Sequence, residues 1–241
     1  MLVLFTDFGL EGPYVGQMKA VLHRAAPGVP VIDLFADAPC FDPLASAHLL
    51  AAYSPEFPPG SVFLCVVDPG VGSERRAVVL EADGRCFVGP DNGLMDVVAA
   101  RAGRAAWREI VRRPDRLSAS FHGRDLFAPV AAALAAGRVG QGWLAPLDRA
   151  VDPASGADLA RVVYVDRYGN AMTGLRAASL PATAKLAVGG RELARARTFA
   201  DVTGGGAMWY MNANGLAEIA VNGGRADKTL GLDVGTVVEI R

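Results

Sequence analysis

The first part of the chain alternates short apolar segments with longer stretches of helical character, and this alternation constrains the fold more than any other feature. Residues 2–5, 29–35 and 62–67 form apolar runs of the length that buried strands have. Residues 14–26 and 43–53, which lie between them, have helical patterns. Strands that alternate with helices form a parallel sheet covered by helices. We therefore expect an α/β domain with a mostly parallel sheet and helices on both faces.

The same domain is predicted to continue to about residue 150. Residues 77–90 (AVVLEADGRCFVGP) have the pattern of a hairpin, and residues 94–102 and 124–136 have helical patterns. The next ten residues, VDPASGADLA, have the composition of a linker. The expected first domain therefore comprises residues 1–150, and the linker comprises residues 151–160.

The remaining residues, 161–241, contain short β patterns between glycine turns instead of long helices. Segments of this kind are RVVYVD, AKLAVGG, GLAEIAVN and GTVVEIR, each of them apolar or alternating. Many short strands of this type form small sandwiches or barrels. The second domain is therefore predicted to be smaller than the first and to consist of β-structure.

Composition and charge exclude several classes of partner. The chain has 241 residues, of which 51% are hydrophobic and 20% charged, so it has ample material for a packed core. Its net charge is −1 and it contains no run of Lys or Arg, so we expect neither nucleic acid nor a membrane as a partner. Its apolar runs are shorter than the roughly 18 residues of a membrane span, and no basic leader precedes the first strand. These features predict a cytoplasmic protein.

The number and spacing of the cysteines indicate neither a disulfide framework nor a metal site. Cys40, Cys65 and Cys86 are odd in number and far apart, and none forms a CxxC or Cys/His ligand spacing. We therefore expect reduced thiols and no metal. The glycines near the first strand do not form GxGxxG, so the dinucleotide fingerprint is absent as well.

Polar side chains follow two of the apolar strands. Asp7 lies in TDFG after the first strand, and Asp68 opens DPGVGSERR, which contains Arg75, after the third. Open α/β sheets bind ligands at the carboxyl ends of their strands. His122, in SFHGRD, precedes an apparent helix start, where it can act as a base, a donor or a charge partner. Each motif alone also fits turn or cap chemistry, so the combination is what predicts a site.

Other polar motifs fit structural roles as well as ligand binding. Asp91 or Asn92 in GPDNGLM is expected to cap a helix rather than to take part in catalysis. In the second domain, Asp166 and Asn170 flank the tight turn DRYGN, and Asn222 begins an Asn-Gly pair. An Asn amide has a donor and an acceptor that suit the edge of a purine, whereas Asn-Gly also suits a turn. Both interpretations stay open on these residues alone.

Taken in order, six motifs resemble those of the S-adenosylmethionine hydroxide adenosyltransferase family, which is related to the fluorinases and chlorinases. They are TDFG, DPGVGSERR, GPDNGL, FHGRD, DRYGN and NxxGLxEIAxNxG, and they extend over nearly the whole chain. The resemblance implies an amino-terminal α/β domain, a carboxy-terminal β-barrel domain and a homotrimer with active sites between subunits. It also implies hydrolysis of S-adenosyl-L-methionine to adenosine and L-methionine, with this substrate and no further cofactor.

The resemblance also implies roles for individual residues. Asp68, Arg75 and His122 correspond to a catalytic set that positions water or hydroxide for in-line attack on the ribose C5′. The residues that correspond to ligand contacts are Asp7 for the ribose diol, Asp166 for the methionine ammonium, and Asn170 with the backbone of Asn222 and Gly223 for the adenine.

Two segments depart from the family pattern, and two other functions remain open. Ala213 stands where an NS-x-G segment has its Ser, and FADAP at residues 35–39 lacks a His. The protein could instead bind S-adenosylmethionine or adenosine without turnover, or it could be a halide-using synthase. The negative charge of Asp68 disfavours the synthase, because it would repel a halide at the nucleophile position.

Overall fold

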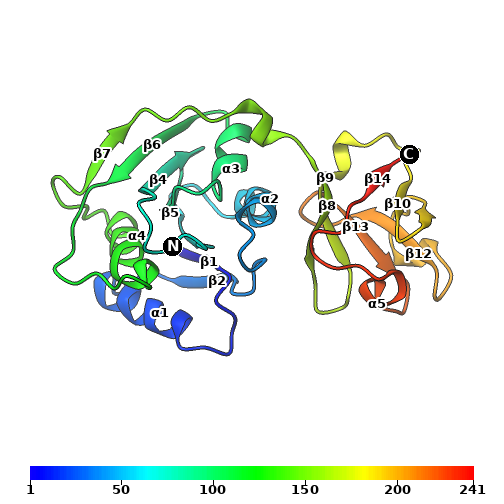
Figure 1. Cartoon of the computed structure of the whole chain (residues 1–241), viewed down its shortest axis with the longest axis horizontal. Coiled ribbons are helices and arrows are strands. Elements are labelled where there is room, and N and C mark those ends of the chain that lie inside the picture. Colours follow the sequence, from blue (N-terminus) through cyan, green and yellow to red (C-terminus); the bar gives the residue numbers. More distant parts are fainter. The chain divides into compact units, whose positions relative to one another are not determined.

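The computed structural model describes residues 1–241, and the chain divides into two compact units. The first unit comprises Met1–Gly156 and the second comprises Ala157–Arg241. In Figure 1 the first unit runs from blue to yellow-green, and the second from yellow to red.

The first unit is built on a seven-stranded mixed sheet with the strand order β2-β1-β3-β5-β4-β6-β7. The pairs among β2, β1, β3 and β5 are parallel, whereas the pairs β5/β4, β4/β6 and β6/β7 are antiparallel. All strands except β4 and β7 therefore run in one direction, which confirms a mostly parallel sheet. The strands are β1 (Leu2–Thr6), β2 (Val31–Phe35), β3 (Val62–Val66), β4 (Ala77–Ala82), β5 (Arg85–Pro90), β6 (Ala105–Ile110) and β7 (Leu144–Leu147).

Helices cover both faces of this sheet (Figure 1). Side chains alternate along a strand, so Leu2 and Leu4 of β1 share one face, where they join a buried cluster with α1 (Tyr14–Ala25) and α4 (Ala128–Ala135). Phe5 points to the other face and packs on Phe35, which in turn packs on a tyrosine of α2 (Pro43–Tyr53). The short helix α3 (Asp96–Arg101) lies beside α2. Both apolar faces of the parallel strands are thus buried, which is why their sequences read as continuous apolar runs.

Two predicted helices of the first unit differ in their boundaries. The helix expected at 94–102 is the shorter α3, and the one expected at 124–136 begins as a single π-helical turn, Gly123–Phe127, before α4. Pro129 explains the second difference, because it has no N–H to donate to the carbonyl four residues earlier. The N–H of Ala128 instead bonds to the carbonyl of Gly123, five residues back.

The second unit consists of two antiparallel sheets around its own core. One sheet has the order β12-β13-β9-β8 and the other has the order β11-β10-β14. Trp209 is fully buried in this core, and its indole Nε1 donates to the carbonyl of Ala184 at 3.1 Å. The strands are β8 (Leu159–Val165), β9 (Ala171–Arg176), β10 (Leu186–Val188), β11 (Arg191–Leu193), β12 (Ala207–Met211), β13 (Leu216–Val221) and β14 (Glu239–Ile240), with the short helix α5 (Ala226–Leu230). The predicted short strands are confirmed, and α5 is the one α-helix among them.

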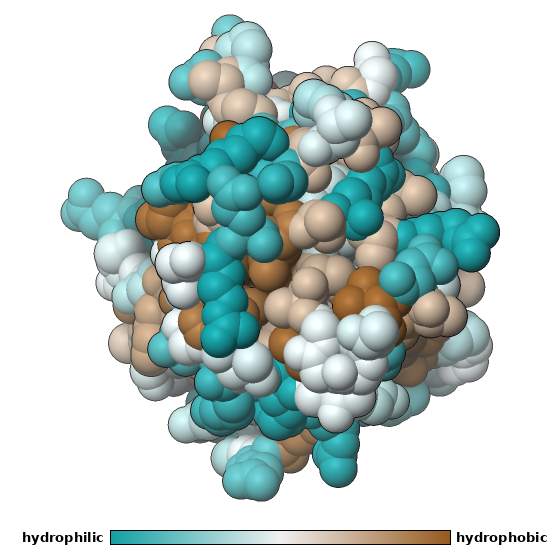
Figure 2. All heavy atoms as spheres, turned by 90° about the vertical axis from the view of Figure 1, so that its right-hand side faces the viewer, coloured by the Kyte–Doolittle hydropathy of each residue, from teal (hydrophilic) through white to brown (hydrophobic).

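Two isolated β-bridges also connect the two sheets. Arg161 in β8 pairs with Val237, just before β14, and Arg195, just after β11, pairs with Trp209 in β12. On the face that Figure 2 shows, hydrophilic and hydrophobic side chains are interspersed. None of the helices in either unit has the length and apolar character that a membrane crossing requires.

Candidate active site

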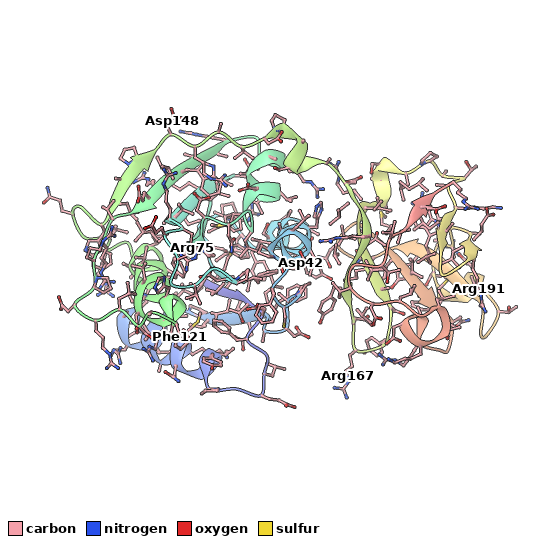
Figure 3. The ribbon with its side chains drawn as sticks, in the orientation of Figure 1. Asp42, Arg75, Phe121, Asp148, Arg167 and Arg191 are labelled. Atoms are coloured by element: carbon pink, nitrogen blue, oxygen red, sulfur yellow. The ribbon has the colours of Figure 1, made fainter.

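The predicted carboxylate Asp68 lies just beyond the carboxyl end of β3 and is held by Arg75 from the loop that follows. The guanidinium Nε donates to Asp68 Oδ1 at 2.7 Å, and Nη2 donates to Oδ2, so the pair is bidentate. The Asp68 side chain is 5% exposed and that of Arg75 is 9% exposed. Figure 3 shows Arg75 inside the first unit, in contrast to Asp148 at its margin. An ion pair this deeply buried persists only when both partners are present and well aligned.

His122 completes this cluster from a segment that is distant in sequence. Arg75 Nη2 lies 3.3 Å from His122 Nδ1. A guanidinium can only donate, so Nδ1 is the acceptor and the proton of the neutral ring sits on Nε2. Burial and the adjacent Arg75 hold the pKa of His122 below its ordinary value of 6.5. The ring is therefore neutral at pH 7, with its Nε2–H free for a further contact.

The loop after β3 reaches the segment of His122 because Gly72 allows a tight path. Gly72 has φ = +83°, and a Cβ there would lie 2.8 Å from the carbonyl oxygen of Ala119. The loop thus packs directly on the segment that leads to His122. The guanidinium carbon of Arg75 also lies 5.4 Å from the centre of the Phe127 ring, within the π-helical turn.

Asp68 and His122 line a cavity of about 590 Å³ in the first unit. Asp7, at the carboxyl end of β1, lines the same cavity, as expected for adjacent parallel strands. The other lining residues are Phe8, Tyr14, Gln17, Cys40, Phe41, Val66, Val71, Ser118, Ser120, Phe121, Gly123 and Arg124. Phe8, Tyr14 and Phe121 form a cluster of rings with centroids 5.4 to 5.8 Å apart. The cavity therefore combines an aromatic wall with convergent polar groups, which is typical of a small-molecule site.

The Asp7 side chain is held in this cavity by a hydrogen bond from the backbone of a neighbouring loop. The amide of Phe41 donates to Asp7 Oδ2 at 3.3 Å, and Phe41 itself has a left-handed backbone conformation with φ = 59°. Burial raises the pKa of Asp7, and the hydrogen bond from Phe41 opposes this shift. The second carboxylate oxygen keeps its capacity to accept further hydrogen bonds.

Asp166 and Asn170, the predicted ligand residues of the second unit, are joined to each other across the DRYGN turn. The backbone amide of Asn170 donates to Asp166 Oδ1 at 2.9 Å, and its side-chain Nδ2 lies 3.3 Å from Asp166 Oδ2. Gly169 makes the turn possible with φ = +86°, since a Cβ there would lie 2.6 Å from Asp227 Oδ1.

Asn222 and Gly223 lie in a separate turn of the second unit. The Asn222 side chain donates to the carbonyl of Val202 at 2.7 Å, and its backbone amide donates to Gly206 at 3.0 Å. Gly223 has φ = +70°, which explains the glycine at this position. The Asn222 side chain therefore supports the turn, and the Gly223 backbone is the part that remains available.

The sequence analysis missed one residue of interest, Glu218, and expected a different role for another, Asn92. Glu218 of β13 is 3% exposed and accepts hydrogen bonds from the side chains of Tyr210 and Asn212. Asn92 donates from Nδ2 to the carbonyl of Val67 at 2.8 Å, which ties the turn after β5 to the residue before Asp68. Glu218 read as one polar residue in an alternating strand, and no local signal reveals partners that come from other segments.

Neither Asp91 nor Asn92 caps α3 itself, although Asn92 Oδ1 accepts a hydrogen bond from the backbone amide of Leu94 at 3.3 Å in the turn before this helix. The first residue flanking α3 is Met95, which makes no side-chain capping bond. Asp91 instead pairs with Arg149 at 2.8 Å, and Arg149 also holds Asp96 at 2.8 Å. The aspartates therefore anchor the segment after β7, and Asn92 serves β3.

The acidic, histidine and cysteine side chains do not gather into metal-binding groups. No set of three or more His, Cys, Asp or Glu residues is arranged to hold an ion. The three cysteines are free, and Cys65 is fully buried within β3. The polar groups that the structure brings together beside the cavity are the Asp68 carboxylate, the Arg75 guanidinium and the His122 imidazole.

Comparison with known proteins gives relatives that span almost the entire chain. An (R)-S-adenosyl-L-methionine hydrolase of Thermus thermophilus is 42% identical over 98% of this chain and 97% of its own length. A protein of the same name from Salinispora arenicola is 41% identical over 98% of this chain and 95% of its own length. A fluorinase from Nocardia brasiliensis is more distant, at 24% identity over 100% of this chain and 96% of its own.

A solved structure is similar to this chain in both fold and sequence. The crystal structure of an uncharacterized conserved protein from Thermotoga maritima matches with a TM-score of 0.83 and 36% identity, covering 100% of this chain and 99% of that one. Two family models match in succession, the SAM hydroxide adenosyltransferase N-terminal domain at residues 2–142 and the C-terminal domain at residues 160–239. The chain therefore belongs to the SAM hydroxide adenosyltransferase family.

Proposed function

We propose that this protein is an enzyme that hydrolyses S-adenosyl-L-methionine to adenosine and L-methionine. The observation that carries the proposal is the Asp68–Arg75–His122 cluster at the wall of a 590 Å³ cavity, in which the ion pair of Asp68 with Arg75 is buried. Relatives at 42% and 41% identity are named (R)-S-adenosyl-L-methionine hydrolases, which supports the same activity here.

The proposed reaction does not require a general acid. Attack at the ribose C5′ forms a C–O bond and breaks the C–S bond of a sulfonium, and the electron pair leaves on a neutral thioether. The leaving group thus needs no proton, and the main task is to hold the nucleophile in line with the C–S bond. One proton must leave the attacking water, or else hydroxide attacks directly.

Asp68 is the group that we assign to the nucleophile. Each of its oxygens accepts one hydrogen bond from Arg75, and a carboxylate oxygen can accept more than one. Asp68 can therefore accept a hydrogen bond from a water molecule while Arg75 keeps its carboxylate in one orientation. His122 would supply its Nε2–H to the same water or to a ribose oxygen, because Arg75 already occupies Nδ1.

Substrate recognition is assigned to residues of both units. In this proposal Asp7 binds the ribose diol, for which a carboxylate with one oxygen still able to accept is well suited. Asp166 binds the methionine ammonium, and Asn170 with the Asn222–Gly223 backbone binds the adenine. Ala213 replaces a serine hydroxyl of the family, yet its turn keeps a support from Asn212, whose Oδ1 accepts from the amides of Asn214 and Leu216.

We further propose a homotrimer with active sites between subunits, in which residues 1–150 carry the catalytic set and residues 161–241 contribute to the ligand pocket. Exposed apolar side chains at the cavity support an assembly that covers them, since Phe41 is 78% and Tyr14 is 48% exposed. The backbone pairs at Arg161 and Arg195 support the closure of the two second-unit sheets into one barrel. The free thiols support a reducing, cytoplasmic location.

Product analysis tests the proposed activity. The purified protein is incubated with S-adenosyl-L-methionine, with and without chloride, and the products are separated by chromatography. Adenosine and methionine in equal amounts, independent of chloride, are expected. A 5′-chloro-5′-deoxyadenosine product would instead reveal a halide-using synthase, and bound but unchanged substrate would reveal a binding protein.

The role of Asp68 is tested with a matched pair of variants. Asp68→Ala is expected to reduce turnover by about 10² or more while substrate still binds, because positioning and proton acceptance are lost together. Asp148→Ala, which removes an exposed carboxylate far from the cavity, is the control and should keep full turnover. Wild-type turnover in Asp68→Ala would remove this residue from the mechanism.

A further inference from the structure

The turn that follows β5 has no part in the reaction proposed above, yet it contacts both ends of the loop that carries Asp68 and Arg75. In the sheet, β5 lies between β3 and β4; it is parallel to β3 and antiparallel to β4. The chain that leaves β3 must therefore cross the carboxyl end of β5 before it enters β4. Residues 67–76 make this crossing, and residues 91–92 follow directly on β5.

The side chain of Asn92 holds the first end of this loop. Its Nδ2 donates to the carbonyl oxygen of Val67 at 2.8 Å, and its Oδ1 accepts from the backbone amide of Leu94 at 3.3 Å. The second bond fixes the orientation of the side-chain amide, because only its oxygen can accept from an N–H. The paired residues of β3 and β5 end at Leu64 and Val88. Asn92 therefore adds a hydrogen bond beyond the end of the backbone ladder.

The backbone of the same turn holds the second end of the loop. The amide of Asp91 donates to the carbonyl oxygen of Arg76 at 3.0 Å. The Asp91 side chain accepts from Arg149 Nε at 2.8 Å, and both side chains are only 16% exposed. This ion pair anchors the turn to the segment after β7. The two contacts of the turn thus lie immediately before Asp68 and immediately after Arg75.

The position of Asp68 depends on the bond that Asn92 makes to Val67. Val67 is fully buried, so its carbonyl cannot bond to water in place of Asn92. A buried carbonyl without a donor is costly, and the backbone would have to shift to satisfy it. This carbonyl belongs to the same planar peptide unit as the amide nitrogen of Asp68, so such a shift would move Asp68 directly. Arg75 would move with its partner, and with it the contact to His122.

We propose that Asn92 is a positioning residue, which fixes the peptide unit before Asp68 and so keeps the Asp68–Arg75 pair aligned for the nucleophile. The inference rests on the proposed function, in which Asp68 holds the attacking water. Asn92 does not line the cavity, so it acts through Asp68 and not on the substrate. Misplacing a group that orients a reactant lowers the rate of the chemical step.

Steady-state kinetics of Asn92→Asp test the proposal. The substitution keeps the size of the side chain but replaces Nδ2 with an acceptor, which cannot bond to the Val67 carbonyl. We expect kcat to fall by about 10- to 100-fold while KM changes by less than about threefold. A wild-type kcat in the folded variant, as judged by its thermal midpoint, would overturn the proposal.

Ser61→Ala is the matched control, because it deletes a similar bond at the other end of β3. Ser61 is 1% exposed, and its Oγ donates to the carbonyl oxygen of Pro58 at 2.7 Å. This variant should lose stability but keep kcat within about twofold of the wild type. An equal loss of kcat in Ser61→Ala and Asn92→Asp would mean that general destabilisation explains the effect, which would overturn the proposal.

A double variant shows whether Asn92 acts through Asp68. In the Asp68→Ala background, Asn92→Asp should lower the residual turnover by less than about twofold, because the group that it positions is already absent. The same fold reduction in both backgrounds would show that Asn92 acts elsewhere and would overturn the proposal.

Hydrogen exchange at Arg75 gives a test that needs no turnover. The Nε–H of Arg75 bonds to Asp68 Oδ1 at 2.7 Å, and its NMR signal is assigned by its loss in Arg75→Lys. Its exchange with solvent should be at least about tenfold faster in Asn92→Asp than in the wild type, and unchanged in Ser61→Ala. If Asn92→Asp does not fold, Asn92→Ala, which adds no charge beside Asp91, repeats these measurements. Unchanged exchange, or failure of both variants to fold, would remove Asn92 from the positioning role.

The two proposals fail in different ways. If the wild type yields adenosine and methionine and Asn92→Asp keeps its kcat and the slow exchange at Arg75, the positioning proposal alone is wrong. If no product forms but exchange at Arg75 is faster in Asn92→Asp and not in Ser61→Ala, the hydrolase proposal alone is wrong.

Discussion

At the scale of single residues, Arg75 has the most demanding position in the site, because one guanidinium serves both Asp68 and His122. Its Nε and Nη2 point at the two oxygens of Asp68, and Nη2 also reaches His122 Nδ1. A lysine would offer a single ammonium on a flexible stem in place of this planar fork. The geometry therefore depends on arginine and not on positive charge alone.

Arg75→Lys should lower kcat by tenfold or more and destabilise the protein by about 1–3 kcal/mol, since a buried carboxylate loses part of its hydrogen bonding. Chemical denaturation and steady-state kinetics measure the two effects. Arg108→Lys is the comparison, because Arg108 and its partner Glu81 have side chains 49% and 39% exposed. That surface pair should contribute no more than about 1 kcal/mol. Equal, small effects of both substitutions would contradict the assigned role of Arg75.

The pKa of His122 gives the site a predictable response to acid. Since the folded protein holds this pKa below 6.5, the unfolded chain binds the proton more readily than the folded one. Stability should therefore rise with pH from the lowered pKa up to about 6.5 and level off above it, and turnover should follow the same trend if the neutral ring is required. Stability and turnover are measured at a series of pH values between 5 and 8. In the His122→Asn variant, the part of each pH dependence that comes from His122 should disappear. A rate that rises as the pH falls through this range would contradict a neutral His122.

At the scale of elements, Gly89 of β5 packs directly against the backbone of β3. A Cβ on Gly89 would lie 2.3 Å from the carbonyl oxygen of Cys65, so any larger residue must separate the two strands. Gly16 in α1 shows the opposite situation, since a Cβ there meets nothing within 4 Å. Glycine at position 89 is therefore required by packing, whereas glycine at position 16 only lowers the helix propensity of α1.

Gly89→Ala should destabilise the protein by at least about 1–3 kcal/mol through overpacking. Gly16→Ala should stabilise it by about 0.5–1 kcal/mol, because alanine restricts the unfolded chain and suits the helix. Urea titration of both variants against the wild type gives the two values. A destabilising Gly16→Ala would mean that α1 requires glycine for a reason other than backbone freedom.

The elements that the sequence predicted well are those whose burial is uniform. Strands β1 and β3 are fully buried, and their continuous apolar runs made them evident. Strands β6 and β7 are partly exposed and short, so their mixed patterns gave no comparable signal. The helix before residue 128 was misjudged because the pattern shows an apolar face but not the backbone path that Pro129 imposes.

Some features of the candidate site could be predicted from the sequence and others could not. The positions of Asp7 and Asp68 follow from the parallel order of β1 and β3, which the sequence indicates. The contact between Arg75 and His122 spans 47 residues, and the contact between Asn92 and Val67 spans 25. Such contacts depend on tertiary packing, which no local pattern encodes.

At the scale of the whole molecule, the proposed assembly predicts complementation between defective subunits. If each active site takes its catalytic set from one subunit and its ligand contacts from a neighbour, Asp68→Ala and Asp166→Ala chains can form some complete sites when they are mixed. Refolding the two inactive variants together should then restore part of the wild-type activity, up to about a quarter of the sites by random pairing. The two variants refolded separately and then combined serve as the control. No recovery in mixed oligomers, with size-exclusion chromatography confirming that they formed, would place each site within one subunit.

The bidentate pair at the cavity wall also bears on the surroundings in which this protein can work. Dissolved ions weaken attractions between charges at a protein surface over distances of about 8–10 Å, but they reach buried charges far less. Asp68 and Arg75 are withdrawn from solvent and bring no net charge as a pair. The arrangement that we propose to hold the nucleophile should therefore survive in concentrated brine as in dilute buffer, so that salt tolerance is set by the outer surface and not by the proposed catalytic centre.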